Sequence, residues 1–192
     1  MLRLLPHLLL LLLASHTLLA QKPQPTKIIS CGSLPAGTTE KTQKAVEEIE
    51  EMWVCNLLDA GDPTDSQEAK ERRQKAFKIL RNIYSDDFKY VDSKGDPEEK
   101  KKHLERLRSR ELQFHQIDVK NRKTVVKNEN GRGNTRATAI VTFDAVYAVR
   151  VTDKDKSSPL IYNAKITHQW MWEKQNPRWQ MISHKTERLK QE

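Results

Sequence analysis

The chain has 192 residues and a formal net charge of +8, with 34 Lys and Arg against 26 Asp and Glu. This length suits one domain with its own core, and the charge bears on solubility and nonspecific association rather than on fold. Basic and acidic residues alternate over 68–111, which is typical of a solvated helix surface. We therefore expect no nucleic acid partner, while weak contact with a polyanion or an anionic membrane remains open.

Residues 1–20 have the pattern of a secretory signal peptide. Arg3 supplies a minimal positive charge, 8–13 is an unbroken leucine run, and 20–21 is the favoured cleavage site. The leucine run is far shorter than the roughly 20 apolar residues of a membrane-spanning helix, and no later stretch could cross a bilayer. We expect a secreted mature chain without a transmembrane segment, beginning with an extended leader over 21–43 that is rich in proline, threonine and glycine.

Two cysteines, Cys31 and Cys55, follow the predicted cleavage site. An even count in an oxidising compartment predicts a disulfide, which would pin the leader to the first helix. The alternative is a buried Cys55 and an exposed Cys31 that pairs with nothing.

The first half of the chain carries helical periodicity. Apolar residues of 44–60 recur at helical spacing with glutamates mostly opposite them, and Gly61 supplies a stop. A second apolar stripe predicts a helix over 66–84, followed by a short strand over 88–91. Asp96, Pro97 and Glu99 have the residue types of a helix start, so we expect a third helix that continues to about Arg108.

The second half is rich in β-branched and aromatic residues. Short strands are predicted over 112–119 and 124–127, and three long strands over 137–151, 162–173 and 179–188. Turn-forming residues occupy 128–134, 153–159 and 175–178. Helices gathered early and an antiparallel meander late imply an α+β fold, with the three N-terminal helices packed on one face of an antiparallel sheet.

This pattern resembles the nuclear transport factor 2-like superfamily, and within it the polyketide-cyclase-like (SnoaL-like) and kinase-association-domain-like branches. The resemblance covers about 44–189, and its most specific piece is the hairpin Trp172-Glu173-Lys174, turn, Trp179-Gln180-Met181-Ile182. A glycine common in that turn is replaced by Pro177-Arg178. The resemblance implies a cone-shaped fold in which helices and a strongly bent sheet enclose a pocket, and it implies frequent dimerisation through the outer face of the sheet. It implies little about chemistry, because this fold hosts enzymes, binders and assembly modules alike.

Two residues, His168 and Asp144, are weak candidates for a catalytic role. His168 shares a strand face with Trp170, where it could act as a general base in a pocket, although a buried, hydrogen-bonded imidazole is the favoured interpretation. His184 is interpreted in the same way. Asp144 would be a base only if it pointed inward, and the solvent or dimer face is favoured. His103 and His115 have no suitably spaced partner, so we expect no metal, and no motif indicates a cofactor.

Five aromatic residues could line an apolar pocket, although ordinary core packing is favoured for them: Trp53, Tyr84, Phe88, Tyr147 and Trp170. The absence of a catalytic motif favours a secreted, non-catalytic binding or interaction module for a small apolar ligand or a protein partner, with a homodimer as a further expectation. The alternative is a cofactor-independent lyase, isomerase or hydrolase that uses His168 or Asp144.

Overall fold

The computed structural model describes residues 40–128, 135–151 and 160–189. The predicted signal peptide, most of the leader, Cys31 and two predicted turns, over 128–134 and 153–159, lie wholly or almost wholly outside the described residues. Within the described ranges, no helix is long and apolar enough to span a membrane.

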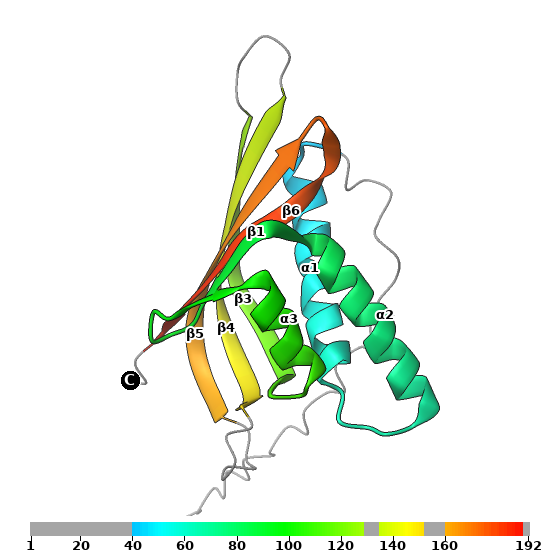
Figure 1. Ribbon diagram of the computed structural model, residues 1–192. Coiled ribbons are helices and arrows are strands. Elements are labelled where there is room, and N and C mark those ends of the chain that lie inside the picture. Colours follow the sequence, from blue (N-terminus) through cyan, green and yellow to red (C-terminus); the bar gives the residue numbers. More distant parts are fainter. Residues whose placement is uncertain (1–39, 129–134, 152–159, 190–192) are drawn as a thin grey trace, which may run out of the picture.

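The described residues form three helices and six strands, whose arrangement Figure 1 shows. The helices are α1 (Gln43–Gly61), α2 (Gln67–Ile83) and α3 (Lys100–Arg108). The strands are β1 (Tyr84–Val91), β2 (Pro97–Glu99), β3 (Leu112–Asn128), β4 (Arg136–Val151), β5 (Leu160–Glu173) and β6 (Asn176–Arg188). The α+β class is therefore confirmed, and the three long C-terminal strands lie close to their expected positions.

All six strands belong to one open sheet in the order β2-β1-β6-β5-β4-β3. The expectation of an antiparallel sheet is wrong at one place, because β1 runs parallel to β6 while every other pair is antiparallel. The sheet is mixed for a topological reason. β1 precedes the meander of β3 to β6 and enters the sheet beside its last strand, whose direction is set by the meander.

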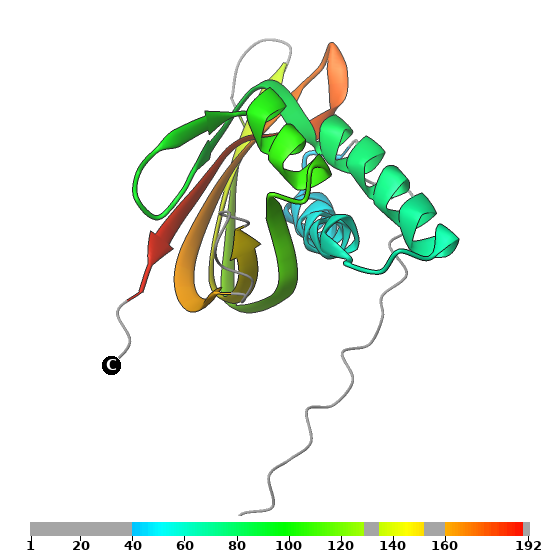
Figure 2. The ribbon, with the colours of Figure 1, turned by 60° about the horizontal axis from the view of Figure 1, so that its bottom comes forward.

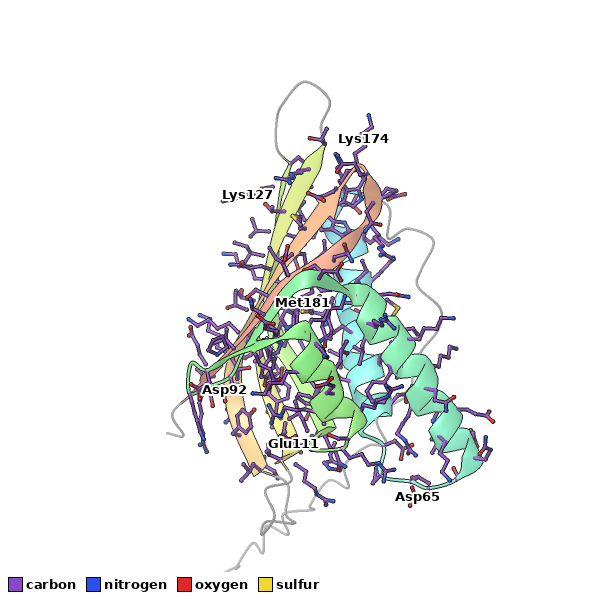
Figure 3. The ribbon with its side chains drawn as sticks, viewed as in Figure 1. Asp65, Asp92, Glu111, Lys127, Lys174 and Met181 are labelled. Carbon is purple, nitrogen blue, oxygen red and sulfur yellow. The ribbon has the colours of Figure 1, made fainter. Side chains whose placement is uncertain are left out.

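The helices lie together on one side of the curved sheet (Figure 2). α1 packs against α2 and β3, and its buried side joins the inward residues of the strands in one hydrophobic core. Alternate residues of β4 face this core, as the period of two in a half-buried strand requires. Met181 of β6 lies between the sheet and the helices, whereas the other labelled residues lie at the periphery (Figure 3).

Local signals place the first two helices correctly. The side chain of Thr42 accepts a hydrogen bond from the backbone N–H of Ala45, and Ser66 does the same for Ala69, each at 3.2 Å. Hydroxyl caps of this kind satisfy backbone donors that have no partner within the first helical turn. The two predicted helices differ from the observed ones by one residue at each end.

Two sequence expectations fail in the middle of the chain. The predicted capping by Asp96 is wrong, because Pro97–Glu99 forms β2 on β1 and α3 begins only at Lys100, with no side-chain cap at Glu99. The two short strands predicted over 112–127 are one strand, β3, whose pairing with β4 is interrupted between Lys120 and Lys123. Asn121 lies in that interruption with φ of 52°, so the gap between the two predicted strands is an irregularity within one strand.

Gly61 allows α1 to approach β3 at close range. A Cβ atom at this position would lie 2.4 Å from the backbone oxygen of Phe114 and 2.8 Å from its nitrogen. We expect Gly61→Ala to lower the free energy of unfolding by about 2 kcal/mol or more, because backbone atoms must move to relieve the overlap. Urea unfolding checks this, with Gly95→Ala as the comparison. That exposed turn glycine has φ of 89° and open space around it, so a cost of about 1 kcal/mol is expected from the backbone alone.

Candidate functional site

The five aromatic residues predicted for a pocket lie in the interior between helices and sheet. Trp53, Tyr84, Phe88, Tyr147 and Trp170 are all among the largest fully buried side chains. The indole N–H of Trp53 donates to the Tyr84 hydroxyl at 3.0 Å, and the Tyr84 and Phe88 rings stack at 4.1 Å. These residues pack against one another as a core, and a pocket lined by them remains a prediction.

A glutamate from α1 lies at the centre of this interior. Glu50 is 1% exposed and accepts a hydrogen bond from the indole N–H of Trp170 at 2.7 Å. Its two carboxyl oxygens lie 2.7 and 2.8 Å from Nδ1 of His168. A buried carboxylate is costly unless donors surround it, and here two donors from β5 converge on it.

The hydrogen bonds continue from His168 into the last strand. Nε2 of His168 lies 2.8 Å from Nδ1 of His184, and Nε2 of His184 lies 2.9 Å from the Thr186 hydroxyl. The register explains the meeting, because His168 on β5 is directly opposite His184 on β6. We call this set of Glu50, His168, His184, Thr186 and Trp170 the buried histidine relay.

Geometry limits the number of protons that the relay can hold. An ionised carboxylate only accepts, so Nδ1 of His168 donates to Glu50. The contact between the two imidazoles then has room for one proton, carried by either His168 or His184. Two protonated imidazoles would place two N–H groups against each other at 2.8 Å. All the hydrogen bonds of the relay can therefore form with at most one imidazolium. A second imidazolium would break the hydrogen bond between His168 and His184.

A second buried cluster lies beside the relay. The Tyr90 ring stacks between His103 of α3, at 4.4 Å, and His184, at 4.7 Å. Nδ1 of His103 lies 3.1 Å from Glu98, and Glu98 also pairs with Arg106 at 2.8 Å. His103, for which the sequence showed no suitably spaced partner for a metal, thus contacts a carboxylate from β2 and the rings of Tyr84, Phe88 and Tyr90.

Burial shapes the titration of these groups. Desolvation lowers the pKa of His184 well below its ordinary value, and the nearby His168 and His103 lower it further. Desolvation also lowers the pKa of His103, although its bond to Glu98 opposes the change. Burial raises the pKa of the Tyr84, Tyr90 and Tyr147 hydroxyls, so these groups are protonated donors at neutral pH.

The hydroxyl of Tyr147 is one of several buried polar atoms of the described residues that lack a hydrogen-bond partner. It is fully buried and finds no hydrogen-bond partner among the described residues. An unsatisfied buried hydroxyl costs about 1–3 kcal/mol. A bound polar group would satisfy this hydroxyl.

Asp144 does not join the interior groups. Its neighbours Phe143 and Ala145 face the core, whereas Asp144 is half-buried on the outer side of β4, opposite Lys165 of β5. It accepts a hydrogen bond from the Asn121 side chain at 2.8 Å. The favoured interpretation of Asp144, on the outer face of the sheet, agrees with this position. Asp144 and the buried His168 lie on opposite faces of the sheet.

Glu50 is the interior residue that sequence reasoning missed. It lies in the run Glu47, Glu48, Glu50, Glu51, which suggests a solvated surface. Its position provides the missing signal, because Val46 and Trp53 are buried at four residues before and three residues after it. A glutamate within the apolar stripe of an amphipathic helix indicates a buried acid that needs partners.

The predicted disulfide stays a prediction. Cys55 lies half-buried on α1, and Cys31 lies outside the described residues. We expect the protein to show no reactive thiol when unfolded without reductant and two after reduction. Thiol titration in denaturant checks this, and two reactive thiols before reduction would exclude the bridge.

Comparison with known proteins places this architecture in a fold class. No family model matches the sequence, and no curated protein matches it. Among solved structures, an NTF2-like protein from Cytophaga hutchinsonii has a TM-score of 0.57 at 9% identity, with 77% of this chain and 98% of that chain covered. A Ca/calmodulin-dependent kinase II association-domain-like protein from Exiguobacterium sibiricum has a TM-score of 0.56 at 14% identity, with 84% of this chain and 100% of that chain covered.

The chain therefore has the nuclear transport factor 2-like fold, as its sequence resemblance implied. At these identities the likeness establishes the fold alone, and the fold is compatible with many functions.

Proposed function

We propose that this protein is a secreted, non-catalytic interaction module that associates with a second copy of itself through the outer face of its sheet. The observation that carries the proposal is the occupied interior, where tryptophans fill the space and both ring nitrogens of His168 and of His184 are hydrogen-bonded. A general base needs a free lone pair within reach of substrate. The filled interior is instead typical of a rigid scaffold that contacts its partners through its outer surfaces.

The outer face of the sheet has features of an association surface. Val125 and Ile140 are paired across β3 and β4, and both are 40% exposed. Ile161 of β5 is 66% exposed towards the other end of the same face. Polar side chains separate these apolar positions, among them the charged Asp144 and Lys165. A mixed surface of this kind is usual for interfaces that form between folded proteins. The kinase-association-domain-like neighbour supports assembly as the role of such a face.

The test is the mass of the purified chain in solution. We expect light scattering of the wild-type chain to give the mass of a dimer. The double variant Ile140→Lys, Ile161→Lys should be a folded monomer, because dimerisation would bury two ammonium groups of each partner in an apolar contact. Gln67→Lys with Asn82→Lys adds the same charge at exposed positions of α2 and should leave the dimer intact. A wild-type monomer at all concentrations overturns the self-association.

A second function is favoured by the unpaired Tyr147 hydroxyl. A small apolar ligand with one polar group would satisfy it, as would a substrate of a cofactor-independent lyase, isomerase or hydrolase in which Glu50 and His168 form a carboxylate–imidazole pair. Native mass spectrometry distinguishes the functions. An added mass that is lost in Tyr147→Phe supports the interior ligand. A bare chain that Tyr147→Phe stabilises supports the scaffold.

A further inference from the structure

An open groove of about 810 Å³ runs between α2 and α3 on the helical side of the molecule. Seven of its thirteen lining residues are Lys or Arg, and three are acidic. The groove is therefore electropositive, and it is lined by none of the residues of the buried histidine relay.

Most of these cations are not neutralised within the protein. Two of the seven have internal partners: Arg73 donates to the backbone oxygens of Asp62 and Thr64, and Lys100 pairs with Asp86 at 2.9 Å. The other five are exposed and make no ion pair with any residue of the described ranges: Lys70, Lys78, Arg81, Lys101 and Arg108. Like charges gathered along one groove repel each other, and an anionic partner would relieve that repulsion.

The cations form two rows with an apolar strip between them. On α2 the lining residues recur every three or four positions from Lys70 to Arg81, and on α3 they do so from Lys101 to Arg108. Phe77 and Leu104, one from each helix, are half-buried and pack against the core beneath. Two basic rims and an apolar floor match a helix that has acidic flanks and an apolar edge.

We propose that the α2–α3 groove binds an acidic, amphipathic helical segment of a partner protein. The acidic lining residues favour this occupant over a uniform polyanion. Glu99 and Glu105 would face the repeated charges of a sulfated sugar or a nucleic acid, whereas a peptide can place its carboxylates over the cations alone. The floor has two apolar side chains, which suits an anchor residue of a helix better than an acyl chain.

α2 and α3, whose residues line the groove, lie on the side of the sheet opposite the proposed dimer face (Figure 2), so the two surfaces can function independently. A chain that does not dimerise can still bind a partner in the groove, and a chain whose groove binds nothing can still dimerise. The two proposals can therefore fail separately.

The experiment measures binding by fluorescence anisotropy with full mature chain. The probes are labelled helical peptides with leucine or phenylalanine at i, i+4 and i+7 and glutamate on both flanks, and scrambled peptides of the same composition are matched to them. A heparin oligosaccharide and a single-stranded oligonucleotide serve as the polyanion probes. We expect the patterned peptides to bind at least about tenfold more tightly than the scrambled ones, with affinity falling as salt is raised.

Charge reversal locates the site. Lys78→Glu with Arg81→Glu should weaken peptide binding by at least about tenfold. Lys94→Glu with Lys174→Glu makes the same net change at exposed turns outside the groove, with Lys174 far from α2 in Figure 3, and should change binding less than about twofold. Equal losses in the two double variants overturn the proposal. So does equal binding of scrambled and patterned peptides, polyanion binding as tight as peptide binding, or no binding by any patterned peptide.

Discussion

Replacing Glu50 with alanine is expected to lower the free energy of unfolding by about 3–5 kcal/mol, the range for removing one partner of a buried charged cluster. The variant leaves the N–H groups of Trp170 and His168 without their acceptor and opens a void beneath α1. Urea unfolding followed by tryptophan fluorescence gives the value. Glu50→Gln retains one acceptor oxygen and should cost less than alanine.

The neighbouring Glu51 provides the matched control. It is exposed, and its partner is Arg122 at 3.4 Å. An ion pair of that kind contributes at most about 1 kcal/mol, so Glu51→Ala should stay below that cost. Similar losses at positions 50 and 51 would contradict the role assigned to the relay.

Acid is expected to destabilise the fold before its carboxylates titrate. The pKa values of His184 and His103 are lower in the folded chain than the value of about 6.5 in an unfolded chain. The unfolded state therefore binds more protons as pH falls through about 6.5, so stability that is present above that pH is progressively lost below it. The slope reaches up to about 1.4 kcal/mol per pH unit for each histidine.

Unfolding free energies between pH 8 and pH 5 provide the test. The lowered pKa of Glu98 contributes only below its ordinary range near 4.5, so this window isolates the histidines. His184→Gln should flatten the profile, because the relay then has one less group to protonate. His115→Gln serves as the comparison. The pKa of His115 is also lowered, by desolvation and by Arg150, but His115 is only partly buried and has no part in the relay, so this variant should flatten the profile less than His184→Gln. A flat wild-type profile, or one that rises towards pH 5, would show that the buried histidines do not govern acid stability.

The predictions from sequence were accurate where local signals were complete. Clear apolar stripes and the stop at Gly61 predicted the first two helices to within a residue. The long β-branched runs gave β4 and β5, and the aromatic hairpin gave the superfamily fold that comparison with solved structures supports. These features depend on residues near one another in the chain, so periodicity and turn chemistry predict them.

At Pro97 the local sequence signal predicted the wrong structure. Asp96, Pro97 and Glu99 have favourable residue types for a helix cap, yet pairing with β1 takes precedence and delays α3. Pairing within this β1–β2 hairpin outweighs a cap worth about 1 kcal/mol. The parallel contact of β1 with β6 joins segments almost a hundred positions apart and leaves no local pattern in either.

The sequence by itself determined the fold class, the first helices, the meander and the inward parity of His168, because each follows from short-range periodicity. Only the tertiary structure decided that Glu50 accepts from His168 and Trp170, that His184 completes the relay, and that α2 and α3 align their cations along one groove. Such contacts join residues up to 120 positions apart. The spacing of residues along a chain carries no information about partners that only folding brings within hydrogen-bonding distance.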